Sequence, residues 1–187
     1  MRIKPDRMDY DFAKILYDDE VRKINNECYL SGIKILNISP AGSLRRKRRT
    51  IGDLDLVINT SNNKLFKEIA EKRLDYYPTQ NSCFLKKKIV KSNIDMFVAD
   101  QYDFHSMLFF LTGSEDWNLK IMGHLHRNSN IRYTPFCFLE KKESIFKIFK
   151  FSSEKEIFNK IGLKFVEPKL RIPKNVKIIK EKNEQIK

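Results

Sequence analysis

The sequence is poor in cysteine and has no long apolar run. Its three cysteines, Cys28, Cys83 and Cys137, are widely spaced, and their odd number leaves no complete disulfide framework. No CxxC pair is present to hold zinc, so we expect free thiols in a reducing, intracellular compartment. The first residues contain no apolar segment of a secretory signal. Since no uncharged apolar stretch approaches membrane-spanning length, no membrane partner is expected.

Negative charge is also in deficit. The 187 residues include 37 lysines and arginines against 24 aspartates and glutamates, which gives a formal net charge of +13. This excess favours a nucleic-acid partner, because cationic side chains release condensed counterions when they bind phosphates. From charge alone, an anionic membrane surface or an acidic protein stays open. With 41% hydrophobic and 12% aromatic residues, the chain can bury a core in one compact unit or two small ones.

Hydrophobic patterning predicts a strand-rich first half with helices beside it. A helical stripe of apolar residues runs through 6–30, and a second helix capped by Asn63 is expected to end near residue 74. Apolar strands are predicted at 34–40, 54–58, 82–90 and 93–99. This pattern indicates an α/β or α+β module, and we predict α+β.

The second half has a different pattern. Residues 115–128 follow a helical pattern after the apolar run 102–111, and 133–139 resembles a strand. The segment 153–156 matches a capping box, which opens a helix that stops at Gly162. The expected divisions are a first domain at 1–102, a smaller second domain at 103–173 and an extended basic, polar tail at 174–187.

Three aspartates lie in or beside predicted strands. Asp53 and Asp55 are two residues apart, so their side chains point to the same face of a strand, and Asp95 lies in another apolar strand. An aspartate inside an apolar strand is costly unless it is paired, hydrogen-bonded or metal-bound. Mg²⁺ prefers oxygen ligands, and two ions about 4 Å apart can activate an attacking oxygen and stabilise departing pyrophosphate. We therefore predict that the three carboxylates are catalytic and hold two Mg²⁺ ions, for which Mn²⁺ can substitute.

A candidate phosphate-binding turn precedes these aspartates. Gly42 allows the backbone to approach an anion, Ser43 adds a hydroxyl donor, and Arg46 can bind a phosphate in bidentate fashion. Taken singly, each half of this pattern is better explained by a simple turn and a solvated basic face. The turn and the carboxylates together favour phosphate chemistry.

These residues resemble the palm signature of DNA polymerase family X, within the nucleotidyltransferase superfamily. The signature consists of Gly42-Ser43-Leu44-Arg45-Arg46 and Gly52-Asp53-Leu54-Asp55. Residues 110–114 are similar to the family's Tyr-Phe-Thr-Gly-Ser motif, and the resemblance extends over about 2–171. It continues in Asn118, the helix 153–161 and the closing segment 167–171. The resemblance implies a palm with a mixed sheet and helices, followed by a smaller α/β thumb.

The resemblance implies a template-directed DNA polymerase of the repair type. Such an enzyme adds dNTPs to a primer 3′-hydroxyl in short gaps by a two-metal mechanism and releases pyrophosphate. Asp95 would assist deprotonation of the primer hydroxyl, and Arg2 would match an arginine near the triphosphate. The implied nucleotide-binding residues are Gly42, Ser43 and Arg46 at the phosphates, Phe110 and Gly113 at the sugar, and Asn118 at the base. Gapped or primed DNA, dNTPs and a DNA ligase are the expected partners of a monomer.

The sequence also departs from the family pattern. Phe110 stands where a tyrosine is common, Leu111 where a second aromatic is usual, and Met122 where repair enzymes carry an arginine that contacts the template minor groove. Losing that contact loosens checking of base-pair shape, so modest fidelity is expected. The chain leaves no room for lyase or fingers domains, and in this it resembles the minimal polymerases of large DNA viruses such as the African swine fever virus type. DNA contacts would then come from Arg45, Arg48, Lys86, Lys87 and Lys120.

Two other functions stay open. One is a template-independent nucleotidyltransferase that acts on RNA ends, proteins or antibiotics. The other is an inactive DNA-binding module that retains the fold. The motif at 112–118 and the basic charge speak against the first, and the three intact aspartates speak against the second.

Overall fold

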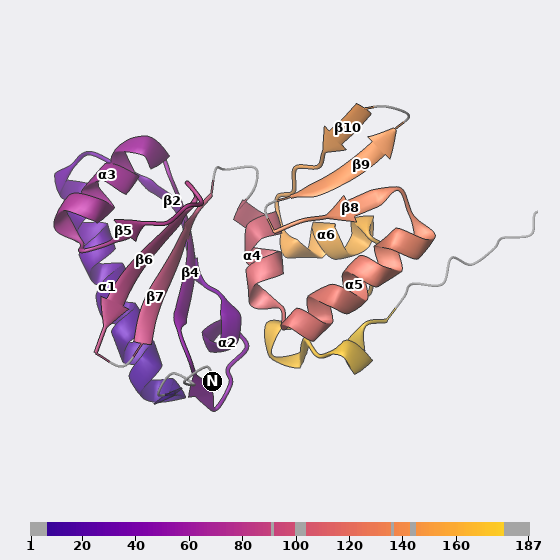
Figure 1. Ribbon diagram of the computed structural model, residues 1–187, viewed down its shortest axis with the longest axis horizontal. Coiled ribbons are helices and arrows are strands. Elements are labelled where there is room, and N and C mark those ends of the chain that lie inside the picture. The colour runs from indigo at the N-terminus through magenta and orange to yellow at the C-terminus, as the bar shows by residue number, and fades with distance from the viewer. Residues whose placement is uncertain (1–6, 91, 100–103, 136, 143–144, 178–187) are drawn as a thin grey trace, which may run out of the picture.

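The computed structural model describes residues 7–90, 92–99, 104–135, 137–142 and 145–177. Within these ranges the chain forms two lobes: a five-stranded mixed sheet with helices, and a three-stranded sheet with helices (Figure 1). The α+β prediction is confirmed. The predictions for Arg2 and for the joint at 100–103 lie outside the described residues.

The N-terminal lobe is built around the sheet β2-β4-β7-β6-β5, in which β4 and β7 pair in parallel and the other neighbours are antiparallel. The short strands β1 and β3 pair separately. The elements are β1 (Met8–Asp9), α1 (Tyr10–Leu30), β2 (Ile35–Pro40), α2 (Gly42–Arg45), β3 (Thr50–Ile51), β4 (Leu54–Thr60), α3 (Asn63–Arg73), β5 (Tyr77–Pro78), β6 (Phe84–Ile89) and β7 (Ser92–Val98).

The N-terminal cap of α3 differs from the prediction by one residue. The side chain of Asn62 accepts a hydrogen bond from the backbone N–H of Leu65 at 3.0 Å, so Asn62 is the cap. Asn63 instead bonds to Thr60 and to the carbonyl of Ala99, 2.8 Å away. The second asparagine therefore ties the start of the helix to the end of the neighbouring strand.

Strand alternation separates the main core face of the central strands from an opposite face of mixed character. Leu54, Leu56 and Ile58 of β4 are fully buried in one cluster with Ile94 and the following alternate residues of β7. Helices α1 and α3 contribute to the same cluster and cover this face of the sheet (Figure 1). The intervening positions of both strands point to the opposite face, because side chains alternate along a strand. This opposite face carries the predicted aspartates.

The C-terminal lobe packs helices against the antiparallel sheet β10-β9-β8. Ser114 caps α5, and Ser153 caps α6 as predicted, through its bond from the N–H of Glu156. The elements are α4 (Phe104–Thr112), α5 (Glu115–Asn128), β8 (Ile131–Tyr133), β9 (Phe138–Lys142), β10 (Ile145–Ile148), α6 (Glu154–Lys160) and two 3-10 turns, η1 (Pro168–Leu170) and η2 (Pro173–Asn175).

The prediction of a single strand at 133–139 is wrong. The chain turns within this segment, and Tyr133 of β8 pairs with Phe138 of β9. Their rings stack with centroids 4.5 Å apart, and the N–H of Thr134 donates to the carbonyl of Cys137 across the turn. Pro135, inside the apolar run, was the local signal of the reversal. No pattern in the sequence indicated the exposed strand β10.

Helix α4 lies between the two lobes and contributes to two cores (Figure 1). Its residues Phe104, Met107 and Leu108 pack with Val57 of β4 and with Ala99. The remaining face contributes Phe109, fully buried in the aromatic core of the C-terminal lobe. Among the described helices, none has the length and apolar character needed to cross a membrane.

Candidate active site

Two of the predicted aspartates face each other across the parallel strands. Asp55 of β4 and Asp95 of β7 are register partners on the face opposite the main core, and Asp53 comes just before β4. Burial, together with the negative charges of Asp95 and Asp53, raises the pKa of Asp55 to about 7. Burial also raises the pKa of Asp95. The three carboxylates therefore form one electrostatic cluster in which negative charge is costly.

The Gly42 turn lies directly against this cluster. Gly42 has φ +51°, and a Cβ placed there would be 1.8 Å from Oδ2 of Asp55. Only glycine permits both this backbone conformation and this approach. The turn and the carboxylate, predicted separately from the sequence, are thus neighbours in space.

The carboxylates already have partners within the protein. The Ser92 hydroxyl bonds to the carbonyl of Gly52 and lies 2.9 Å from Oδ1 of Asp53. Nζ of Lys86 lies 3.4 Å from Oδ1 of Asp95, which is buried and has no hydrogen-bond partner.

The donor set fits a hard divalent cation in part. Asp55 and Asp95 offer adjacent carboxylate oxygens, the ligands that Mg²⁺ prefers. Across the described ranges, no group of three histidine, cysteine, aspartate or glutamate side chains is arranged to hold a metal ion. Asp53, bonded to Ser92, is the predicted ligand that is engaged elsewhere.

Arg46 connects the turn to the start of the C-terminal lobe's motif. Its Nη1 donates to the carbonyls of Thr112 at 2.5 Å and Gly113 at 2.6 Å. Burial lowers the pKa of Arg46, and its Nε is buried without a partner. In the sequence, segments 42–46 and 110–114 were linked only because both resemble motifs of the same family. In the structure the two segments are in direct contact.

The predicted base-contacting residue is engaged inside the C-terminal lobe. Asn118 Nδ2 donates to the carbonyl of Phe110 at 2.8 Å, and its Oδ1 accepts from the Tyr133 hydroxyl at 3.3 Å. A Cβ on Gly113 would be 2.5 Å from the same Oδ1, so Gly113 packs tightly on Asn118. A groove of about 400 Å³ opens beside them. It is lined by Phe110, Leu111, Gly113, Glu115, Asn118, Leu119 and Met122.

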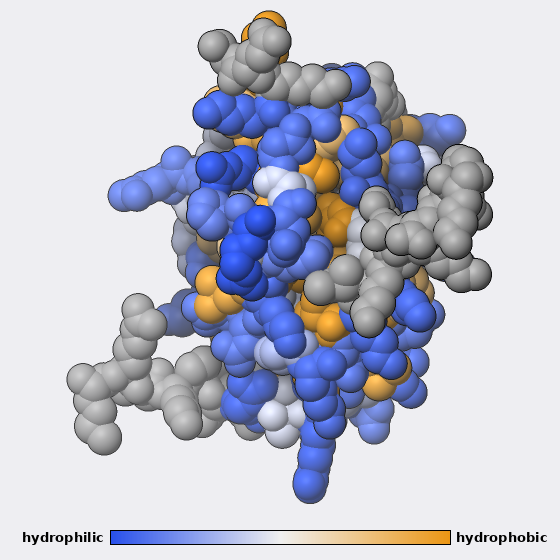
Figure 2. All heavy atoms as spheres, turned by 90° about the vertical axis from the view of Figure 1, so that its right-hand side faces the viewer, coloured by the Kyte–Doolittle hydropathy of each residue, from blue (hydrophilic) through white to orange (hydrophobic). Residues whose placement is uncertain are grey.

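The surface of the C-terminal lobe is mixed. The face of the C-terminal lobe that Figure 2 presents is mainly hydrophilic, with hydrophobic residues exposed in small patches between polar ones. A second groove of about 420 Å³ shares Leu119 and Met122 with the first and extends to Tyr133. Met122, singled out by its departure from the family pattern, therefore separates two apolar hollows.

Arg45, predicted to contact DNA, is bonded within the protein. Its guanidinium makes two bonds to the carboxylate of Glu154, at 3.0 and 2.5 Å, and one to the Thr112 hydroxyl at 2.5 Å. Its donors are directed into the protein because α2 packs against α4. A second arginine, Arg171, is fully buried, donates to Glu154 at 2.8 Å and lies over the ring of Phe109 at 5.1 Å.

The sequence did not lead us to predict Glu154 as the buried partner of these two arginines. Burial works against its charge, but hydrogen bonds from Arg45 and the charge of Arg171 outweigh that effect and lower its pKa. Its spacing could have indicated the role, since Glu154 precedes the apolar Ile157 and Phe158 by three and four residues on one helix face. A glutamate on a buried face requires a cation.

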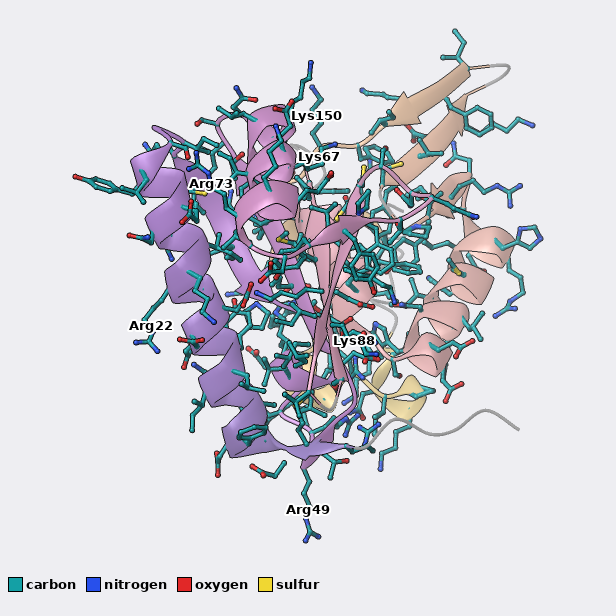
Figure 3. The ribbon with its side chains drawn as sticks, turned by 60° about the vertical axis from the view of Figure 1, so that its left-hand side comes forward. Arg22, Arg49, Lys67, Arg73, Lys88 and Lys150 are labelled. Atoms are coloured by element: carbon teal, nitrogen blue, oxygen red, sulfur yellow. The ribbon has the colours of Figure 1, made fainter. Side chains whose placement is uncertain are left out.

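The basic run on β6 divides between the two faces of the sheet. Lys87, predicted to contact DNA, points toward α1 and pairs with Glu20 at 3.1 Å, with both side chains largely buried. Lys86 points to the opposite face, where it meets Asp95. In Figure 3 Lys88 lies at the sheet, whereas Arg22 projects outward from α1.

The two remaining DNA-contact candidates are placed differently. Lys120 is exposed on α5. Arg48 is partly buried, and its backbone N–H bonds to the carbonyl of Ser43.

The chain was compared with known proteins. No protein-family model matches it. It is 30% identical over 146 residues to the DNA polymerase/3′-5′ exonuclease PolX of Bacillus subtilis (strain 168). The similarity is to a family X DNA polymerase. It covers 73% of this chain and 24% of PolX, so the chain spans about a quarter of that relative's length. At the family level, the similarity supports a polymerase-type nucleotidyltransferase.

Proposed function

We propose that this chain is a template-directed DNA polymerase of family X that fills short gaps in DNA. It would add dNTPs to a primer 3′-hydroxyl and release pyrophosphate, acting as a monomer in DNA repair before a ligase seals the nick. The observation that carries the proposal is the Asp55–Asp95 pair with the Gly42 turn against it. The similarity to PolX supports the same assignment.

The aspartates would hold two Mg²⁺ ions. When bound, such ions supply Lewis-acid activation of the attacking hydroxyl and neutralise charge on the transferred phosphoryl group. In the cluster, Asp55 and Asp95 present adjacent oxygens, and Asp53 would have to exchange its bond to Ser92 to join them. Asp95, whose buried Oδ1 has no hydrogen-bond partner, would accept the proton of the primer hydroxyl.

The turn at Gly42 would receive the triphosphate. Ser43 offers a hydroxyl, and Arg46 has a buried Nε donor without a hydrogen-bond partner. The two carbonyl bonds of Arg46 hold its side chain in place, so little conformational entropy is lost when a phosphate binds. Positioning and charge neutralisation supply most of the catalysis in phosphoryl transfer.

The neighbouring groove would receive the sugar and base. Phe110 and Gly113 line it, and Met122 forms its far side. Asn118 is bonded internally, so it would act first by fixing the shape of the groove through Phe110. With an apolar Met122 at this wall, we expect discrimination between correct and incorrect base pairs to be modest.

Primer extension tests the proposal. The full chain is incubated with Mg²⁺ and with gapped, nicked and template-free DNA, and dNTPs are compared with NTPs. Gap filling directed by the template base supports the proposal, and Asp55→Ala and Asp95→Ala should abolish it while the exposed Asp116→Ala does not. Extension that ignores the template would identify a template-independent transferase. DNA binding without turnover would identify an inactive module.

A further inference from the structure

Lys86 occupies the end of a charged row that crosses three strands. It is the register partner of Asp95 on the antiparallel β6–β7 pair, and Asp95 is in turn the register partner of Asp55. Neighbouring strands lie about 4.8 Å apart, so one ammonium group and two carboxylates follow one another at close spacing. Nζ of Lys86 reaches to 3.4 Å from Oδ1 of Asp95.

An aromatic shelf positions the ammonium group. Nζ of Lys86 lies 5.1 Å from the ring centroid of Phe84, and that ring stacks on Phe97 at 4.5 Å. The lysine side chain keeps 32% of its surface exposed, so its long stem has room to move away from the carboxylate. The shelf therefore directs Lys86 toward Asp95 without enclosing it.

The contact between Lys86 and Asp95 is an ion pair. The buried Oδ1 of Asp95 has no hydrogen-bond partner, so the approach of Lys86 is an ion pair without hydrogen-bond geometry. Such an oxygen keeps its lone pairs available for a stronger cation. Near Asp55, the charges of Arg46 and Lys86 are the two that favour an ionised carboxylate.

We propose that Lys86 is the resident counter-ion of the aspartate pair, and that a divalent cation must displace its ammonium group from Asp95 in order to bind. This inference rests on the proposed function. Lys86 offsets carboxylate repulsion in the metal-free protein and competes with the metal when it arrives. Lys86 thereby lowers the affinity of the site for free divalent cations.

Lys88 provides a matched control. It lies two residues further along β6 on the same face, but its register partner is Asn93 in place of an acid. Lys88 is exposed, and Lys86→Met and Lys88→Met remove the same charge from the same strand. The two variants therefore separate local displacement from a general change in net charge.

The experiment is a Mn²⁺ titration of the full chain, followed by the relaxation enhancement of water protons and without nucleotide or DNA. Lys86→Met should bind Mn²⁺ about fivefold more tightly than wild type, the factor expected for losing one partly exposed ion pair. Lys88→Met should stay within about twofold, and Lys86→Arg, which keeps the charge, should stay near wild type. Unchanged or weaker binding by Lys86→Met, or an equal gain in Lys88→Met, would overturn the inference.

An Asp95→Asn arm distinguishes this inference from the proposed function. If Asp95→Asn binds Mn²⁺ as wild type does, the aspartate site is not a metal site, and both proposals fail. If Asp95→Asn loses binding while Lys86→Met leaves it unchanged, the metal site stands and only the role of Lys86 is refuted. Lys86→Gln repeats the test with a second uncharged side chain, and circular dichroism melts confirm that each variant is folded.

Discussion

Replacing Asp55 with asparagine should stabilise the metal-free protein at neutral and alkaline pH. Asp55 is a carboxylate held by burial and by two other aspartates in a place where its charge is unfavourable. Asparagine has nearly the same shape and carries no charge. The variant should therefore be more stable and inactive, since the arrangement that destabilises the fold is the one proposed to bind metal.

The magnitude follows from the pKa of Asp55, which rises from 3.8 to about 7 on folding. A shift of about three units, at about 1.36 kcal/mol per unit, corresponds to about 4 kcal/mol. The folded state binds the proton of Asp55 more tightly than the unfolded state. The destabilisation caused by the ionised carboxylate is therefore absent below the unfolded pKa and grows as pH rises from about 4 to 7. It is complete above the folded pKa of about 7. The gain in Asp55→Asn should be up to about 4 kcal/mol at pH 8 and under about 2 kcal/mol at pH 5.

Urea denaturation at the two pH values, with chelator present, measures this gain. The exposed Asp116→Asn is the control and should change the free energy of unfolding by less than about 1 kcal/mol at either pH. Adding Mg²⁺ at pH 8 should stabilise wild type more than Asp55→Asn. An equal gain at pH 5 and pH 8, or a loss of stability at pH 8, would show that the charge of Asp55 is not destabilising.

Three further predictions concern the framework and the DNA contact. Glu154→Ala should lower the free energy of unfolding by about 3–5 kcal/mol, because two arginines lose their buried partner. A loss below about 1 kcal/mol in urea denaturation would show that Glu154 does not stabilise these arginines. Gly42→Ala should lower the free energy of unfolding by at least about 1–2 kcal/mol because of the positive φ at this position. The added Cβ should displace Asp55 and remove most primer extension, whereas full activity would show that the turn can move. Affinity for gapped DNA, measured by fluorescence anisotropy, should fall steeply with salt, and a flat dependence would argue against a phosphate-backbone interface.

The central strands and the face that they share were predictable from the sequence. In β4 and β7 apolar residues alternate with Asp55 and Asp95, and a period of two assigns the aspartates to one face. The helix at 115–128 was also predictable, because Ser114 precedes an amphipathic run and caps it. Local pattern and local capping determine these features, so a single sequence carries enough information.

The partners of the basic residues were not predictable in the same way. Alternation alone would have separated Lys86 from Lys87, but nothing local connects Lys87 with Glu20, 67 residues away. Arg45 and Glu154 are separated by 109 residues, and their contact depends on how the two lobes pack. A run of arginines or lysines shows where charge is present. The tertiary fold decides which of those charges face outward.

The double role of α4 has a consequence for attempts to divide the chain. A cut between residues 102 and 103 would leave Phe104, Met107 and Leu108 on the C-terminal fragment, without the surface that buries them. The N-terminal fragment would expose Val57 and Ala99 in turn. Each fragment alone should aggregate, and the two should recover solubility when produced together. The lobes are therefore better treated as one folding unit that a protein engineer can split for complementation, and not as modules to be exchanged between proteins.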